Sequence, residues 1–211
     1  ISLTPSQIIA FSIYADLLTQ WNRTHNLTRV DPADTVSLHF LDSLSLAKVS
    51  PLASGTRLLD AGTGAGFPGL PLAIAFPGLH VTLADATRKK LDFVQEVVNQ
   101  TALTGVEIVH GRLEQLAHEQ RYREQFDLVA VRGVSRLVVL VELLVPFVTV
   151  GGTVVALKNL DIDAEIEEAL PRVEELRGRL QCHRYTVPGT TIIRAAVTVT
   201  KEQSTPARFP R

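Results

Sequence analysis

The residues with the clearest chemical potential form a glycine-rich segment from Asp60 to Gly69. The segment follows a predicted strand and precedes a predicted helix, and glycines at such a turn let the backbone approach a ligand closely. Gly64, Gly66 and Gly69 match the G-x-G-x-x-G pattern of dinucleotide sites, and Asp85 follows about 20 residues later, where it could accept hydrogen bonds from both ribose hydroxyls. A glycine-rich turn without any ligand is a third interpretation, but it would cost chain entropy for no gain.

Asp60 separates the two ligand-binding interpretations. Its carboxylate stands at the end of the first strand of the main domain, where a pyrophosphate would lie and would be repelled. S-adenosylmethionine carries no phosphate, and a negative charge attracts its ammonium and sulfonium groups. We therefore expect S-adenosylmethionine as the cofactor, and the alternative is a nicotinamide-dependent oxidoreductase.

The elements that must position these residues alternate along the chain. Apolar runs predict strands over residues 57–60, 80–85, 107–110, 126–132 and 153–158. Helical patterns fall between and after them, over residues 71–76, 87–103, 135–148 and 164–176. Such alternation requires right-handed crossovers and a parallel sheet with helices on both faces. Residues 181–187 and 191–200 then predict a β-hairpin around Pro188-Gly189-Thr190, which makes one strand antiparallel.

These elements predict an α/β, Rossmann-like methyltransferase domain over residues 51–211, preceded by a small helical extension over residues 1–50. Thr4-Pro5 and Asp31-Pro32 each have the pattern of a helix start in that extension. The net charge of −1 gives no overall basic field for nucleic acid. The single Cys182 excludes an internal disulfide and every multi-cysteine zinc pattern, and it suits a reducing compartment. No apolar run approaches the roughly 20 residues of a membrane span.

Several strings of residues together resemble one family. They are Trp21-Asn22 with Asn26-Leu27-Thr28, His39-Phe40-Leu41-Asp42-Ser43-Leu44, Gly66-Phe67-Pro68-Gly69-Leu70-Pro71-Leu72, and Asp85-Ala86-Thr87-Arg88-Lys89-Lys90. The sequence resembles the bacterial small-subunit rRNA guanine-N7 methyltransferases (RsmG, also called GidB). The resemblance implies a cytoplasmic enzyme that transfers the methyl group of S-adenosylmethionine to N7 of one guanine in 16S rRNA. We expect a monomer that acts on this rRNA within the small ribosomal subunit or its precursor, with no membrane partner.

Carried over by motif, the resemblance implies cofactor contacts at Gly62, Phe67, Asp85, Ala86, Thr87, Leu113, Glu114 and Arg132. Asp60 and Gly64 join this set from the arguments above. Leu113 and Glu114 also lie just beyond the third strand, where they could bracket an adenine, although Glu114 equally fits a solvated acid in a first helical turn. The chain departs from the family pattern at Val131-Arg132-Gly133-Val134-Ser135 and at Lys158-Asn159. These departures concern the positioning of the target base and not the cofactor.

Guanine N7 carries an in-plane lone pair and no proton, so its methylation needs neither a general base nor a nucleophilic thiol. The enzyme must instead supply in-line geometry, exclusion of water and stabilisation of the base. We therefore predict positioning roles for Arg132, at the end of the fourth strand, and for Lys158, at the end of the fifth, where it could donate to guanine O6 or a phosphate. The alternative roles are an ion pair for Arg132 and a solvated strand end for Lys158.

His39, Asp42 and Ser43 are spaced i, i+3 and i+4 and so share one face of the second predicted helix. This face could border the cofactor pocket or the RNA, which makes His39 and Asp42 further catalytic candidates. It could equally tether the helical extension to the main domain, and the sequence favours neither interpretation. A His-x-x-Asp pair is not read as a metal site, because no further ligands accompany it.

RNA contact must come from local basic groups, since the chain has no net positive charge. The candidates are Arg23, Arg29, Arg88, Lys89, Arg136 and Arg208. Arg88 and Lys89 open a predicted helix, where the dipole mildly disfavours cations and so argues for a binding role. Charge runs are usually solvated faces, however, and the sequence favours neither interpretation. No aromatic platform for unpaired bases is evident, and Phe67 and Phe209 are only candidates for stacking. A catalytically idle RNA-binding or assembly factor is the second alternative function.

Overall fold

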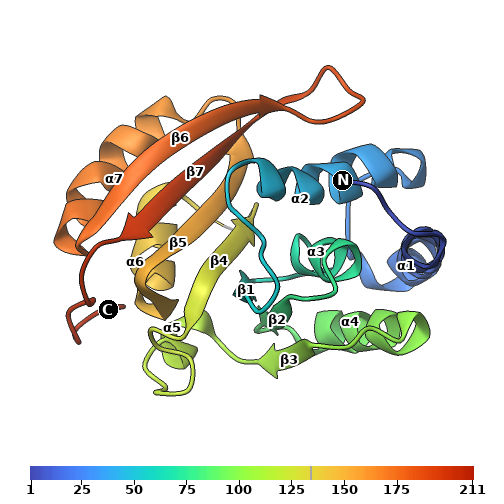
Figure 1. Ribbon diagram of the computed structural model, residues 1–211, viewed down its shortest axis with the longest axis horizontal. Coiled ribbons are helices and arrows are strands. Elements are labelled where there is room, and N and C mark those ends of the chain that lie inside the picture. Colours follow the sequence, from blue (N-terminus) through green and yellow to red (C-terminus); the bar gives the residue numbers. More distant parts are fainter. Residues whose placement is uncertain (134) are drawn as a thin grey trace.

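The computed structural model describes residues 1–133 and 135–211. Within them a seven-stranded sheet has the order β3-β2-β1-β4-β5-β7-β6 (Figure 1). Its strands are β1 (Arg57–Ala61), β2 (His80–Asp85), β3 (Val106–His110), β4 (Phe126–Arg132), β5 (Val148–Asn159), β6 (Gly178–Thr186) and β7 (Ile193–Lys201). The pairs among β1 to β5 are parallel, and β7 runs antiparallel to both of its neighbours. The predicted parallel sheet that ends in a hairpin is confirmed.

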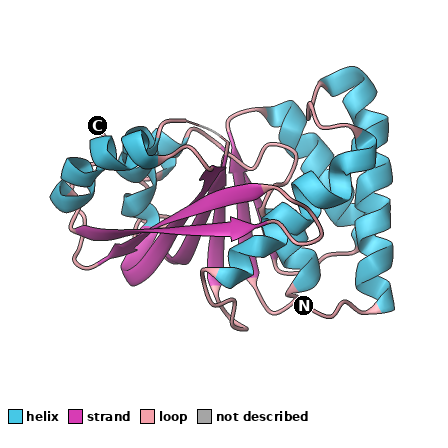
Figure 2. Cartoon of the chain, turned by 90° about the horizontal axis from the view of Figure 1, so that it is seen from above, coloured by secondary structure: helices cyan, strands magenta, loops and turns pink. Residues whose placement is uncertain are grey.

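Successive residues of the central strands alternate between two hydrophobic cores, as the pleat requires. In β4, Leu128 and Ala130 belong to one core, and Val129 and Val131 belong to the other. Helices cover both faces of the sheet (Figure 2). One core is closed by α5 (Leu113–Leu116), α6 (Leu137–Leu144) and α7 (Asp163–Glu175), and the other by α1 (Pro5–His25), α3 (Gly69–Ala75) and α4 (Arg88–Thr101).

The N-terminal helices share a core with the main domain. Helix α1 starts at a capping box formed by Thr4 and Gln7. The chain then forms η1 (Pro32–Asp34), the π-helix η2 (Thr35–Leu41), α2 (Asp42–Leu44) and η3 (Ser45–Lys48). Both predicted helix starts are confirmed. Phe11 and Tyr14 of α1 lie in the same hydrophobic core as Phe67 of the glycine-rich segment, and the domain boundary after residue 50 stays a prediction.

Two element boundaries lie four or more residues from their expected positions. The helix expected over residues 135–148 is α-helical only to Leu144 and continues as the 3-10 helix η4 (Val145–Phe147). Pro146 has no amide hydrogen to donate to an α-helical bond, which explains the change. Strand β5 begins at Val148 and not at residue 153. The sequence did not predict the earlier start, because Gly151-Gly152 interrupts the strand pattern. Val134, part of one departure from the family pattern, lies outside the described residues.

Candidate active site

The carboxyl ends of the parallel strands meet at one edge of the sheet, and the strand order reverses between β1 and β4. At such a switch point the following connections leave in opposite directions and open a crevice. The glycine-rich segment follows β1 there, Asp85 ends β2, Arg132 ends β4, and Lys158 lies near the end of β5. The fold therefore gathers predicted site residues from four strands at one edge.

The glycine-rich segment forms a tight loop that needs glycine at two positions in particular. Gly64 has a φ of +58°, in the left-handed region, and its amide donates to Asp85 Oδ2 at 3.0 Å. At Gly69 a Cβ atom would lie 2.3 Å from Leu83 Cδ2. The Gly69 amide donates to Asp60 Oδ2 at 2.8 Å. These two hydrogen bonds tie the loop to the ends of β1 and β2.

Helix α1 holds this loop from its other side. Tyr14 is fully buried, and its hydroxyl donates to the carbonyl of Ala65. Its ring stacks on Phe67 with the centroids 5.3 Å apart. Burial raises the pKa of Tyr14 well above its ordinary value, so the hydroxyl stays a donor. Tyr14 was not predicted as a site residue, because in the sequence it is one more member of an apolar helix face.

A cavity of about 530 Å³ opens beside the glycine loop, within the size range of small-molecule sites. Eight of the ten predicted cofactor contacts line it: Gly62, Gly64, Phe67, Asp85, Ala86, Leu113, Glu114 and Arg132. Thr87 does not line it, and its amide donates to Asp85 Oδ1 at 2.8 Å. Asp60 lies fully buried behind the loop. Leu27, Thr28 and His39 contribute a wall from the N-terminal part of the chain.

Arg132 joins that N-terminal wall to the main domain. Its Nη1 donates to the Leu38 carbonyl at 3.1 Å and lies 3.4 Å from Asp42 Oδ2. Its Nη2 donates to His39 Nδ1 at 2.8 Å. The guanidinium also lies 4.8 Å from the centroid of the Phe67 ring. The ion pair that the sequence offered as the alternative role is present, and the same side chain lines the cavity.

His39 is a neutral hydrogen-bond relay in this arrangement. A guanidinium only donates, so His39 Nδ1 accepts from Arg132 and the ring proton lies on Nε2. Nε2 then donates to Thr28 Oγ1 at 2.8 Å. Burial and the charge of Arg132 lower the pKa of His39 to about 3. The ring stacks on Phe67 at a centroid distance of 4.2 Å, and at neutral pH it has no free lone pair to act as a base.

Asp42 and Ser43 complete the cluster on the same buried face. Asp42 Oδ1 accepts from the Tyr185 hydroxyl at 3.2 Å and lies 3.9 Å from Arg194 Nε. The Ser43 hydroxyl donates to the His39 carbonyl at 2.6 Å. This face therefore tethers the N-terminal helices to β4, β6 and β7. His39 and Asp42 also line cavities. The same face therefore both tethers the helical extension and borders a cavity, the two interpretations that the sequence left open.

A second cavity, of about 370 Å³, adjoins the first and shares His39, Arg132 and Gly133 with it. Its outer rim includes the charged groups of Lys158, Glu165 and Arg194. Lys158 Nζ donates to the Ser135 carbonyl at 2.8 Å and lies 2.8 Å from Glu165 Oε2. Lys158 is therefore no solvated strand end, and with two acceptors engaged its ammonium group keeps a third N–H for a ligand.

The first cavity fits S-adenosylmethionine on two observations. The Asp85 carboxylate accepts two backbone amides and keeps lone pairs toward the cavity, where ribose hydroxyls can donate. Asp60 Oδ2 accepts from the Thr63 hydroxyl at 2.6 Å and from the Gly69 amide, whereas its Oδ1 is buried without a partner among the described residues. Burial raises the pKa of Asp60 to about 6. A buried acceptor without a donor is costly, and an ammonium group, directly or through water, would satisfy it.

The six predicted RNA contacts fall into two groups. Arg23, Arg29, Arg88 and Lys89 are exposed and form no ion pair within the described part of the chain. The other two are already paired on the surface, Arg136 with Glu168 and Arg208 with Glu175 at 2.9 Å. The first group therefore offers charge to a ligand at the lower cost.

Of the two candidates for stacking, Phe209 is wrong, because it has no exposed surface and lies in a hydrophobic core. Phe67 is 5% exposed and supports the rings of Tyr14 and His39. Among residues 1–133 and 135–211, no helix is both long and apolar enough to cross a membrane, and no three His, Cys, Asp or Glu side chains gather as a metal site.

The sequence matches the family model described as GidB, rRNA small subunit methyltransferase G, over residues 7–184. A protein named Ribosomal RNA small subunit methyltransferase G from Lachnoclostridium phytofermentans is 41% identical over 211 residues, which cover 99% of this chain and 87% of the relative. A protein of the same name from Lactobacillus delbrueckii subsp. bulgaricus is 41% identical over 213 residues, with 99% and 89% covered.

Solved structures share the fold at low identity. A SAM-dependent O-methyltransferase from Thermotoga maritima has a TM-score of 0.63 at 16% identity, covering 92% of this chain and 72% of that one. An rRNA methylase from Streptococcus thermophilus has a TM-score of 0.55 at 18% identity, covering 77% and 95%. The predicted Rossmann-like fold and S-adenosylmethionine as cofactor are confirmed, and neither alternative function is favoured. The chain belongs to the family of rRNA small subunit methyltransferase G.

Proposed function

We propose that the protein transfers the methyl group of S-adenosylmethionine to N7 of a guanine in 16S rRNA. The names of the relatives support rRNA of the small subunit as the substrate. The observation that carries the proposal is the junction of the two cavities at Arg132, His39 and Gly133. One cavity offers the groups that suit the cofactor, and the other offers polar donors around a space suited to a base.

The titratable groups at this junction favour N7 as the acceptor of the methyl group. His39 has both ring nitrogens engaged, and its pKa is lowered by burial to about 3. The Asp42 carboxylate accepts from the Tyr185 hydroxyl and faces the Arg132 guanidinium. An exocyclic amine or a ribose hydroxyl must lose a proton to a base when it is methylated, whereas N7 has no proton to lose. A neutral His39 and an ion-paired Asp42 leave no free base at the junction, and this suits N7.

The side chains supply position and not proton transfer. When bound, S-adenosylmethionine supplies a methyl group activated by the sulfonium charge. We assign the ribose hydroxyls to Asp85 and the adenine to Leu113 and Glu114. The ammonium group is assigned, through water, to Asp60 Oδ1, which lies behind the loop. Ala86 and the loop glycines form the surrounding wall, and the Thr87 amide holds the Asp85 carboxylate in place. Arg132 borders both ligands, and Lys158 donates to guanine O6 or to a phosphate through its third N–H.

RNA contact is assigned first to Arg23, Arg29, Arg88 and Lys89, whose charges have no acidic partner in the described part of the chain. Arg136 and Arg208 would contribute after their ion pairs open. Phosphate contacts of this kind make binding weaker as salt rises. The substrate would be 16S rRNA in the small subunit or its precursor, reached in the cytoplasm by a monomer.

The test is methyl transfer from labelled S-adenosylmethionine to small ribosomal subunits from a strain that lacks this enzyme. We expect label at one guanine of 16S rRNA, and borohydride reduction followed by aniline should break the chain there, because both reagents act on N7-methylguanine. The Arg132→Ala variant, checked for folding by circular dichroism, is the control. No label in rRNA would overturn the proposal, and label at a position resistant to cleavage would overturn the N7 assignment alone.

A further inference from the structure

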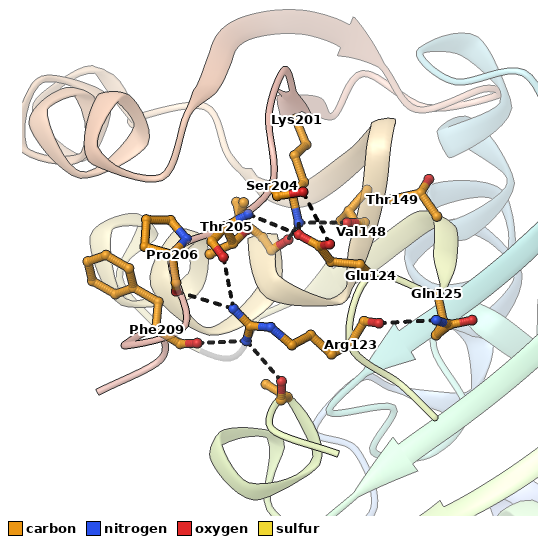
Figure 3. Close-up of polar contacts among 12 residues, drawn as sticks. Arg123, Glu124, Gln125, Val148, Thr149, Lys201, Ser204, Thr205, Pro206 and Phe209 are labelled. Carbon is orange, nitrogen blue, oxygen red and sulfur yellow. Dashed lines mark hydrogen bonds and ion pairs between the residues drawn. The ribbon is translucent and has the colours of Figure 1, made fainter. Parts of the chain in front are cut away.

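Arg123, outside both cavities, joins two segments that are far apart in the sequence (Figure 3). Its Nη1 donates to the carbonyls of Ala117 and Phe209 at 3.1 and 2.8 Å. Its Nη2 donates to the carbonyls of Thr205 and Pro206 at 3.1 and 3.2 Å. A planar fork with several fixed donors can serve several acceptors at once, which an ammonium group cannot do in the same geometry.

The segment Glu202–Arg211 is also anchored at its beginning. Lys201 has no exposed side-chain surface, and its Nζ donates to Glu124 Oε1 at 2.6 Å and to the Val148 carbonyl at 2.9 Å. The Thr205 amide donates to the same Glu124 oxygen at 2.9 Å. Figure 3 shows Lys201 and Thr205 converging on Glu124 beside the Arg123 fork. The segment is therefore held by backbone and side-chain bonds along its length.

This anchorage reaches the cofactor cavity through α5. Arg123 binds the carbonyl of Ala117, and the Ala117 amide donates to the Leu113 carbonyl at 3.0 Å. Leu113 and Glu114 line the cavity. Helix α5 comprises only Leu113–Leu116, and a helix of one turn has too few internal hydrogen bonds to fix its own position. Contacts from outside must therefore fix it.

A second connection runs from the same segment to α6. The Arg211 amide donates to Glu142 Oε1 at 3.0 Å, and the next residue, Leu143, lines the cavity. A third joins the Pro210 carbonyl to His118 Nε2 at 3.0 Å, just beyond α5. The segment Glu202–Arg211 thus spans the two helices that form one side of the cofactor cavity.

We propose that Arg123 is a positioning residue for the cofactor, which fixes α5, and with it Leu113 and Glu114, against the segment Glu202–Arg211. The inference rests on the proposed placement of the cofactor in this cavity. It predicts a coupling between cofactor affinity and the order of a segment that does not touch the cofactor. If the hydrogen bonds of Arg123 only stabilised the fold, this coupling would be absent.

The first experiment measures the Kd of S-adenosylhomocysteine by calorimetry, and the kinetics of methyl transfer, for Arg123→Ala and Arg123→Lys. We expect a Kd and a KM for S-adenosylmethionine raised about fivefold to tenfold, with the KM for the small subunit unchanged. The matched control is Arg121→Ala, because Arg121 is exposed, pairs with Glu119 and contacts no part of the segment. Wild-type Kd values in folded Arg123 variants would overturn the inference.

The second experiment needs no variant, so it tests the coupling between the cofactor cavity and the segment Glu202–Arg211 even where Arg123→Ala fails to fold. Coupling is reciprocal, so S-adenosylhomocysteine must slow hydrogen exchange at the bonded amides of Thr205, Phe209 and Arg211. Unchanged exchange there, with protection at the glycine loop, would overturn the inference and leave the proposed function intact. Failure of the wild-type protein to bind S-adenosylhomocysteine would instead contradict the proposed function.

Discussion

The two cavities that meet at Arg132 are held by different kinds of interaction. Around the first, Tyr14 and Asp60 have no exposed surface, and each binds the backbone of the glycine loop. The second also borders the buried residues His39 and Asp42 and their partner Arg132, but several of its other contacts are between side chains that keep some exposure. Lys158 pairs with Glu165, whose side chain is 30% exposed, and Arg194 donates to Asn159 Oδ1 at 2.6 Å.

This difference indicates how each cavity meets its ligand. A buried polar group that has lost its backbone partner cannot turn to water, so breaking the contact is costly and the wall stays fixed. A partly exposed ion pair contributes little to stability, and its members can exchange partners with a phosphate or a base. We infer that the cofactor side is built before binding, whereas the target side adapts to the RNA.

Arg132→Ala should disturb both cavities at once and cause the largest loss of methyl transfer. We expect transfer to fall about 100-fold to 1000-fold, since the group bordering both ligands is lost. The free energy of unfolding should also fall by about 3–5 kcal/mol, because Asp42 loses its guanidinium partner in a buried setting. Urea denaturation and transfer to small subunits measure the two effects. Wild-type turnover would show that Arg132 does not position the ligands.

The second prediction concerns pH and tests the buried side alone. His39 has a pKa of about 3 in the fold against 6.5 ordinarily, so the unfolded chain binds more protons between these values and stability rises with pH. Asp60 acts oppositely, since its pKa is raised from 3.8 to about 6 and stability falls as pH rises through that range. Each group contributes a slope of about 1.4 kcal/mol per pH unit, of opposite sign.

Single substitutions separate these opposing slopes. His39→Gln should remove the positive slope, so the stability difference from wild type grows as pH rises from 4.5 to 6.5, in steps of about 1.4 kcal/mol per unit. Asp60→Asn should remove the negative slope, so the stability of this variant relative to wild type should increase as pH rises from 3.8 to about 6. Urea unfolding at a series of pH values measures both. Parallel curves for wild type and His39→Gln would contradict the neutral, buried state of His39.

The sequence predicted what depends on local pattern and failed where distant packing decides. Strand and helix periodicity predicted the sheet, and the strand ends predicted which residues meet at its edge. Tyr14 was missed because a tyrosine on an apolar helix face carries no sign of the loop carbonyl that it binds across the fold. Asp60 was expected to face the ligand, but a short acid beside glycines can equally bind their amides. Phe209 was misjudged because burial of a terminal segment has no local signature.

Lys158→Ala tests the adaptable side. We expect kcat/KM for the small subunit to fall about tenfold, as for the loss of one charged hydrogen bond, with the Kd of S-adenosylhomocysteine unchanged. Arg184→Ala is the matched control, because it removes another surface ion pair, with Asp163, without reaching either cavity. A Lys158 variant that weakened cofactor binding and spared the small-subunit kinetics would reverse the assignment of the two cavities.

Tyr14→Phe should have the smallest effect and give the sharpest contrast between the sides. The substitution keeps the buried ring on Phe67 but removes the hydrogen bond from the hydroxyl to the Ala65 carbonyl. The free energy of unfolding should fall by about 1 kcal/mol. We expect the Kd of S-adenosylhomocysteine to rise about fivefold, with the small-subunit KM unchanged. Tyr122→Phe is the control, because the Tyr122 hydroxyl is buried without a partner among the described residues. Equal Kd values in the two variants would mean that α1 does not hold the glycine loop, and the cofactor wall would then depend on Asp60 and Asp85 alone.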